Sequence, residues 1–210
     1  SIERYSAIED IVHPYIRETL KILDIQTFIE VASFGFASGG SGIGGSSSFI
    51  LSFLAALNNC FRKGLSNLDL AQIASKIEID KLSKPIGRQD QFLSCLGDIS
   101  CLKFERKDKV IINQLSKAKK NMLNKEIDNL FLIPSFMTRK ADHVLQNLRN
   151  QPNSIDQFKE IRDIAEEFIL TDEERESHLQ EKFHTSVRDS WKIKRNMSKV
   201  VKKIYVYKKP

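Results

Sequence analysis

A glycine- and serine-rich stretch, residues 37–49, carries the residue types from which a phosphate site can be built. It reads ASGGSGIGGSSSF, and five of its residues are glycine. Because glycine has no Cβ, it can take positive φ and let the backbone approach a ligand closely. An apolar run at helical spacing, residues 49–61, follows at once and predicts a helix. The free N–H groups and positive dipole end at the start of a helix favour an anion, most naturally a phosphate.

Other uses of a glycine-rich stretch fit this spacing less well. Gly40 and Gly45 have the outer spacing of a Walker A loop, but Ser46 stands where its lysine should be. The stretch also satisfies G-x-G-x-x-G, yet a dinucleotide site needs a second strand ending in an acidic residue, and residues 68–79 have a helical pattern. No serine has the glycine neighbours of an esterase elbow. Residues 31–61 carry no charge, but the apolar-periodic part is shorter than the ~20 residues of a membrane span.

Two carboxylates follow the loop at positions that would suit phosphoryl transfer. Residues 66–69 have the spacing of a capping box, which predicts a helix that carries Glu78 near its end. A break at residues 85–87 precedes Asp90, twelve residues beyond Glu78. Asp90 could cap the short helix that follows. Alternatively, both carboxylates converge on the glycine-rich loop, because phosphoryl transfer needs a magnesium ligand and a carboxylate near the attacking hydroxyl.

These residues resemble motifs of the GHMP kinases, the superfamily of galactokinase and the homoserine, mevalonate and phosphomevalonate kinases. Residues 42–47 (GIGGSS) are similar to the family's Gly-Leu-Gly-Ser-Ser nucleotide loop. The chain departs from that motif twice, since Ser38 replaces the proline that usually opens it and Gly45 replaces its first serine. Neither change removes the backbone groups that would cradle a phosphate.

The carboxylate region is similar to a narrower group, the bacterial D-glycero-D-manno-heptose 7-phosphate kinases. Residues 77–80 (IEID) and 85–92 (PIGRQDQF) match that group's Ile-Glu-Ile-Asp and Pro-Ile-Gly-Lys-Gln-Asp-Gln-Tyr, and only Arg88 and Phe92 differ. With gaps, the resemblance runs over most of the chain.

The resemblance implies ATP and Mg²⁺ as cofactors and a sugar phosphate as substrate. In the family the glycine loop cradles the phosphates of ATP, which implies nucleotide binding by Gly40, Ser41, Gly42, Ile43, Gly44, Gly45, Ser46 and Ser47. The family's serine and glutamate hold magnesium, which implies this role for Ser46 and Glu78. The family's aspartate sits by the sugar hydroxyl, which implies that Asp90 is catalytic.

Three residues are expected to contact the substrate, namely Gln89, Thr138 and Arg139. The last two match a Thr-Gly-Ile-Thr-Arg-Ser-Ala-Asp segment at the start of the family's C-terminal domain. Arg139 could meet a substrate phosphate, although an arginine near a helix start is commonly only solvated. Residues 189–194 (DSWKIK) resemble a Glu-Ser-Trp-Glu-Leu-Lys helix of the family, in which Trp191 is expected to pack in the core.

The fold class expected is α+β. The resemblance implies a truncated GHMP kinase fold, with an N-terminal part like domain 2 of ribosomal protein S5 and a ferredoxin-like C-terminal part, divided at residues 115 and 116. The sequence patterns predict helices at 13–23, 49–61, 70–77, 116–125 and within 155–199, strands at 28–36 and 129–133, and a hairpin of 101–105 with 110–115.

Two elements of the family have no counterpart in the sequence. They are the N-terminal strands with a Gly-Gly-Gly-Thr-Asp motif and the glycine-rich loop that should follow the Trp191 helix. From about residue 199 the chain looks unrelated to the family, as a shifted reading frame or a truncated gene would produce. An exposed sheet edge would then favour self-association into a homo-oligomer, and the chain by itself is expected to be inactive.

Composition excludes several other classes of protein. The net charge is +6, but 27 acidic residues are spread among 33 basic ones, so no nucleic-acid partner is expected. Three cysteines form no CxxC pair and four histidines show no zinc spacing. Residues 1–10 do not resemble a signal peptide, and we expect no membrane association and a cytoplasmic location.

The function expected is ATP-dependent phosphorylation of the anomeric hydroxyl of a sugar phosphate. The substrate implied is D-glycero-D-manno-heptose 7-phosphate, on the route to nucleotide-activated heptose and surface polysaccharide. The alternative is a non-catalytic remnant that binds nucleotide weakly or serves as an interaction module.

Overall fold

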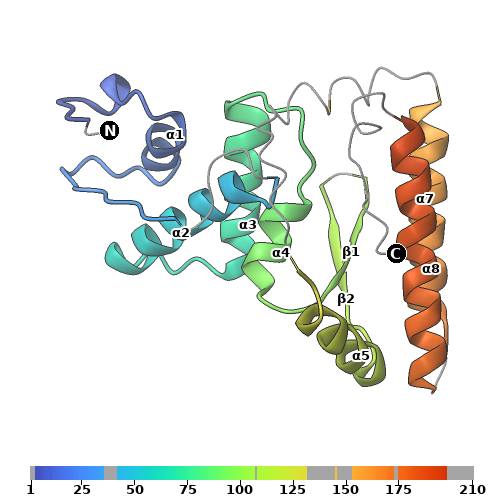
Figure 1. The fold of residues 1–210 in the computed structure, drawn as a ribbon. Coiled ribbons are helices and arrows are strands. Elements are labelled where there is room, and N and C mark those ends of the chain that lie inside the picture. The colour runs from blue at the N-terminus through green and yellow to red at the C-terminus, as the bar shows by residue number, and fades with distance from the viewer. Residues whose placement is uncertain are drawn as a thin grey trace. The chain divides into compact units, whose positions relative to one another are not determined.

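The computed structural model describes residues 3–35, 42–106, 108–131, 145, 153–172 and 175–197. They form two compact units, one of the described residues up to Asp98 and one of those from Ile99 onward (Figure 1). The class is α+β, with helices in both units and a single two-stranded sheet in the described part of the chain. The expected division of the kinase domains after residue 115 stays a prediction.

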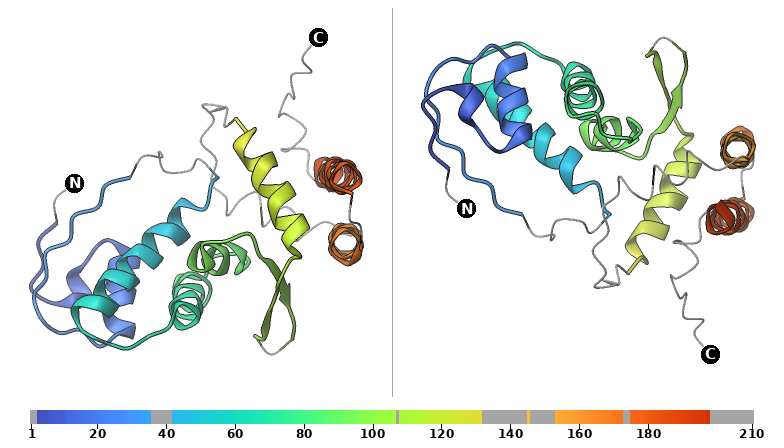
Figure 2. Two further views of the ribbon diagram at one scale, coloured as in Figure 1. Left: turned by 90° about the horizontal axis from the view of Figure 1, so that it is seen from below. Right: turned by 90° about the horizontal axis from the view of Figure 1, so that it is seen from above.

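The first unit is helical. Its elements are the 3₁₀-helix η1 (Ile8–Asp10), α1 (Pro14–Ile22), α2 (Gly45–Cys60), α3 (Asn67–Lys76), the π-helix η2 (Ile77–Lys81) and α4 (Gln89–Leu96). The helices predicted at 13–23, 49–61 and 70–77 are confirmed. Helix α2 packs against both α3 and α4 (Figure 2). Ile50 and Leu54 of α2 and Ile77 of η2 are fully buried in the core that joins these elements.

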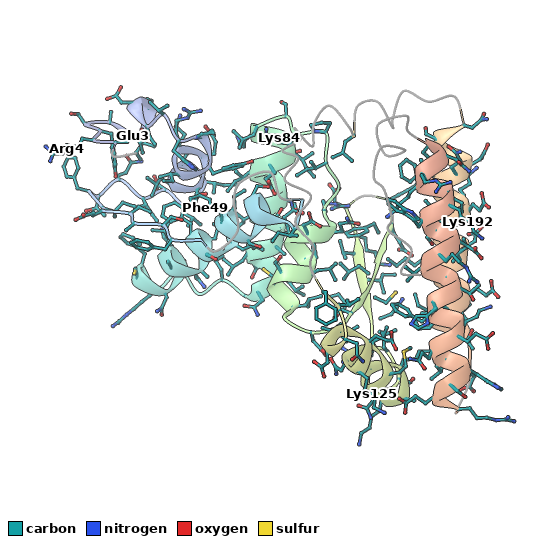
Figure 3. All side chains as sticks on the ribbon, in the orientation of Figure 1. Glu3, Arg4, Phe49, Lys84, Lys125 and Lys192 are labelled. Atoms are coloured by element: carbon teal, nitrogen blue, oxygen red, sulfur yellow. The ribbon has the colours of Figure 1, made fainter. Side chains whose placement is uncertain are left out.

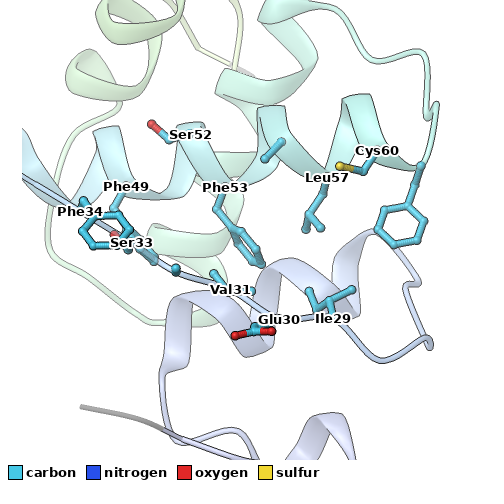
Figure 4. Close-up of a pocket in the computed structure, with 13 residues that line it drawn as sticks. Ile29, Glu30, Val31, Ser33, Phe34, Phe49, Ser52, Phe53, Leu57 and Cys60 are labelled. Atoms are coloured by element: carbon cyan, nitrogen blue, oxygen red, sulfur yellow. The ribbon is translucent and has the colours of Figure 1, made fainter.

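The strand predicted at residues 28–36 is wrong for its described part, residues 28–35, which form neither helix nor strand. A strand needs a neighbour for its ladder of hydrogen bonds, and the described sheet consists of two strands in the other unit. Of the side chains that suggested a strand, Ile29, Val31 and Phe34 lie beside α2 instead (Figure 4). With Phe53 and Leu57 they line a cavity of about 530 Å³ (Figure 4). Phe34, at 95% exposure, remains largely in solvent.

Helix α3 begins with the capping box that the sequence predicts. The backbone N–H of Asp69 donates to Ser66 Oγ at 3.2 Å, and the backbone N–H of Ser66 donates to Asp69 Oδ2 at 2.8 Å. The Ser66 hydroxyl also donates to that carboxylate at 2.6 Å. These bonds from the Ser66 side chain and backbone lower the pKa of Asp69 below its ordinary value.

The capping box makes stability depend on pH. Because the pKa of Asp69 is lower in the folded chain, its stabilising effect is complete above the unfolded pKa of about 3.9 and is lost as the pH falls through the folded pKa. Asp69→Asn should therefore lower the free energy of unfolding at pH 7, and by progressively less below pH 4. Urea unfolding of the wild type and the variant at pH 7 and at a pH below 4 measures this difference, and an equal loss of stability at the two pH values would contradict the prediction.

Ser66→Ala should lower the free energy of unfolding by about 1 kcal/mol at pH 7.

The described part of the second unit combines a hairpin with long helices. Its elements are β1 (Cys101–Phe104), β2 (Val110–Asn113), α5 (Lys117–Asp128), α7 (Ser154–Leu170) and α8 (Glu176–Met197). The strands are antiparallel, with Cys101 opposite Asn113, and α7 and α8 lie side by side. A small core, composed of Met122, Leu123, Phe168 and Leu179, joins the three helices. Charged side chains such as Lys125 and Lys192 point outward (Figure 3).

The hairpin and the helices predicted for this unit are confirmed, with a break between α7 and α8. The strand predicted at 129–133 is wrong for residues 129–131, which form none, and its remainder lies outside the described residues. Trp191, expected in the core, is only half-buried, at the edge of an apolar cavity. Of the helices that the structure describes, none combines the length and apolar character that a membrane span needs.

Candidate functional site

The glycine-rich loop leads directly into α2. Gly42 and Gly44 have φ of +78° and +74°, in the left-handed region that glycine adopts at little cost. Gly44 is the N-cap of α2, so the first N–H groups of this sixteen-residue helix have no intrahelical acceptor. The loop therefore presents backbone donors and a positive dipole end, as predicted for a phosphate site. Gly40 and Ser41 lie outside the described residues.

The carboxylate of Glu78 lies against the first turn of α2. The Ser46 hydroxyl donates to Glu78 Oε1 at 2.9 Å, and the Ser47 hydroxyl donates to Oε2 at 2.8 Å. Gln91 Nε2, from α4, also donates to Oε2. Glu78 is 1% exposed, so this is a buried charge with three hydrogen-bond donors.

The π-helix η2 positions Glu78. It follows α3 without a break, and its neighbour Ile77 is fully buried in the apolar core. The backbone N–H of Leu82 donates to the Ile77 carbonyl at 3.0 Å, and the backbone N–H of Lys84 donates to the Glu78 backbone carbonyl at 2.9 Å. Anchored on both sides, Glu78 faces α2, and π-turns of this kind are frequent at functional sites.

Asp90 lies beside the glycine-rich loop. It is an exposed residue in the first turn of α4, and its Oδ2 lies 3.6 Å from the position that a Cβ on Gly44 would occupy. Arg88, not Asp90, is the N-cap of α4, without a side-chain cap bond, so the alternative role of Asp90 as a helix cap is wrong. In the part of the chain that the structure describes, no hydrogen bond or ion pair engages the Asp90 carboxylate.

The remaining candidates are placed differently. Gln89 is the exposed first residue of α4, and Ile43 is 50% exposed in the loop. Ser47, expected among the phosphate contacts, is buried with its hydroxyl on Glu78, although its backbone N–H remains at the helix start. Thr138 and Arg139 lie outside the described residues.

Sequence reasoning missed Gln91. It belongs to the same QDQ triplet as Asp90 but is fully buried, whereas Asp90 is exposed. The sequence did contain a signal for this residue, because Gln91 is a second glutamine next to Asp90 at the start of a helix that is otherwise mostly apolar.

The oxygen atoms of Ser46 and Glu78 are the candidate ligands for a cation. The described residues contain no group of three or more His, Cys, Asp or Glu side chains suited to a metal. Ser46 Oγ and Glu78 Oε1 lie 2.9 Å apart, so one Mg²⁺ ion could contact both oxygens. Mg²⁺ commonly binds through one or two protein oxygens plus substrate phosphates, so the donor set fits a Mg²⁺–nucleotide complex.

Comparison with known proteins agrees with this geometry. Residues 15–98 match the family "GHMP kinases N terminal domain". The chain is 24% identical over 195 residues to the D-glycero-alpha-D-manno-heptose 7-phosphate kinase of Campylobacter jejuni, covering 91% of this chain and 54% of that protein. It is 43% identical over 58 residues to the galactokinase of Thermococcus kodakarensis, covering 28% of this chain and 17% of that protein.

The chain thus spans about half the length of the heptose 7-phosphate kinase that it matches. The family match contains the start of α2, Glu78 and Asp90, which are the elements of the site described above. Over residues 15–98 the chain is therefore similar to a GHMP kinase N-terminal domain.

Proposed function

We propose that this chain belongs to an ATP-dependent sugar kinase. Residues 40–47 would bind the phosphates of ATP, Ser46 and Glu78 would hold Mg²⁺, and Asp90 would orient or deprotonate the attacking sugar hydroxyl. The observation that carries the proposal is that three groups lie at the start of α2. They are the Ser46 hydroxyl, the Glu78 carboxylate and the Asp90 carboxylate, which has no hydrogen bond in the described residues. Phosphoryl transfer depends mainly on such positioning and charge neutralisation.

Each residue has a separate task in this proposal. Bound Mg²⁺ supplies neutralisation of the phosphate charge. The left-handed backbone at Gly44 turns the loop toward the start of α2, where the free N–H groups can bind phosphate oxygens. Asp90, free of hydrogen bonds in the described residues and beside this loop, can accept a proton from a hydroxyl placed next to it.

We propose a sugar phosphate as the acceptor, with phosphate transferred to its anomeric hydroxyl. The similarity to a heptose 7-phosphate kinase over most of this chain favours D-glycero-D-manno-heptose 7-phosphate, and the galactokinase match supports the broader class of sugars. Gln89, Thr138 and Arg139 remain the proposed substrate contacts. The product would feed the synthesis of nucleotide-activated heptose for surface polysaccharide, in the cytoplasm.

Calorimetric titration with MgATP tests the nucleotide site, and a coupled ADP-release assay with heptose 7-phosphate and galactose tests the transfer. Saturable binding of MgATP followed by sugar-dependent ADP release supports the kinase. Absence of binding would overturn the proposal. Binding of MgATP without transfer would limit the proposed function to nucleotide binding.

Gly44→Val should weaken MgATP binding at least ~10-fold, or ~1.4 kcal/mol. A β-branched side chain resists the φ of +74°, and it would extend toward the Asp90 carboxylate and the phosphates. Gly64→Val is the matched control, because Gly64 has φ of +70° with open space around it and lies outside the loop. It should lower stability but leave the affinity unchanged. Equal affinity of the Gly44 variant and the wild type would place the phosphates elsewhere.

A further inference from the structure

The Gln91 side chain takes part in the candidate site without a role in the proposed function. It is fully buried, and its Nε2 donates to Glu78 Oε2. Its Oε1 is also buried and has no hydrogen-bond partner among the described residues. An unpaired buried carbonyl destabilises a fold, so packing alone does not account for a glutamine here.

The two oxygens of the Glu78 carboxylate have different neighbours. Oε2 accepts from Ser47 and Gln91, both buried, whereas Oε1 accepts from Ser46, which is exposed. A carboxylate oxygen has two lone pairs, so the acceptor sites of Oε2 are filled. Among the described residues, Oε1 accepts one hydrogen bond, from Ser46, and so has the capacity for a second interaction.

We propose that Gln91 and Ser47 are positioning residues, which hold Oε2 so that Oε1 and the Ser46 hydroxyl face a divalent cation. The inference rests on the proposed function and adds to it the means by which Glu78 is oriented. The terminal torsion of a glutamate is broad, so a carboxylate held at one point can turn. Two donors from different elements, α2 and α4, stop this rotation. Residues that support a metal ligand in this way commonly change metal affinity ~10- to 100-fold when replaced.

The test compares nucleotide binding with and without metal. Affinity for ATP is measured by calorimetry in EDTA and in Mg²⁺, and Mn²⁺ binding in the presence of ATP is followed by electron paramagnetic resonance. Gln91→Met, of similar size but without the amide, should weaken the metal-dependent part ~10- to 100-fold and leave affinity in EDTA unchanged. Ser47→Ala, a smaller change in case Gln91→Met unfolds, should act in the same direction. Ser75→Ala is the control, because Ser75 is a buried serine that bonds only the Ala71 carbonyl.

A double-mutant cycle separates positioning from a structural role. In the Glu78→Gln background, Gln91→Met should have no further effect on the metal-dependent part, because it acts through Glu78. Two results would overturn this inference without contradicting the proposed function. One is an equal loss of ATP affinity in EDTA and in Mg²⁺, and the other is an unchanged metal dependence of ATP affinity in both the Gln91 and the Ser47 variants. If the ATP affinity of the wild-type protein did not depend on metal, this result would contradict the proposed function and therefore this inference as well.

Discussion

In a complete form of the kinase, replacing Asp90 by asparagine is expected to lower the rate of phosphate transfer ~10²- to 10⁴-fold, the usual contribution of a general base, while MgATP affinity stays within a few-fold. Asparagine has nearly the same shape but cannot accept a proton from a hydroxyl. The Asp90 carboxylate makes no hydrogen bond in the described residues, so the exchange should leave the fold intact. Sugar-dependent ADP release and calorimetry on the same preparation measure the two effects.

Asp80→Asn is the matched control for this variant. Asp80 is also an exposed aspartate, two residues beyond Glu78 in η2, but it has no role in the proposed chemistry. Its replacement should leave transfer unchanged. If Asp90→Asn turned over at close to the wild-type rate, Asp90 would not be the catalytic carboxylate. If both variants lost activity equally, a general loss of acidic charge would explain the result instead.

Glu78→Gln is expected to abolish most of the effect of Mg²⁺ on ATP affinity. The loss of affinity in Mg²⁺ should exceed ~100-fold, which is the upper end of the loss expected when a residue that only supports a metal ligand is replaced. A neutral amide is a much weaker ligand for a hard cation than a carboxylate. The fold should tolerate the change. The Gln91 amide can turn its Oε1 toward the new amide N–H, Ser46 keeps the amide oxygen as its acceptor, and the Ser47 hydroxyl can accept from the amide instead of donating. Calorimetric titration in EDTA and Mg²⁺, with urea unfolding, measures affinity and stability.

Glu78→Leu gives the contrasting result. It leaves the buried donors of Ser47 and Gln91 without an acceptor, and each unsatisfied group costs about 1–3 kcal/mol. We therefore expect a marked loss of stability for leucine and a small one for glutamine. A full effect of Mg²⁺ on the Glu78→Gln variant would show that Glu78 is not a metal ligand.

The elements that could be predicted from the sequence depend on residues close together in the chain. The capping box joins Ser66 and Asp69, three positions apart, and the apolar positions of α2 recur every three or four residues. The hairpin of β1 and β2 also joins neighbouring segments. Short-range signals of this kind need no knowledge of the rest of the fold. By contrast, the strand predicted at 28–36 depended on a distant partner, and β propensity reflects packing against such neighbours more than a backbone preference.

The sequence by itself determined which residue types the candidate site contains: a glycine loop before a helix, then Glu78 and Asp90. Only the tertiary structure decided how they meet. Ser46 and Ser47 lie 32 and 31 residues from Glu78 along the chain, and Gln91 lies 13 residues away. The packing of α2, α3 and α4 around buried residues such as Ile77 brings these side chains together. Because that packing places one oxygen of the carboxylate on the buried Ser47 and Gln91 and the other on the exposed Ser46, the direction in which Glu78 would bind the proposed cation is a property of the fold.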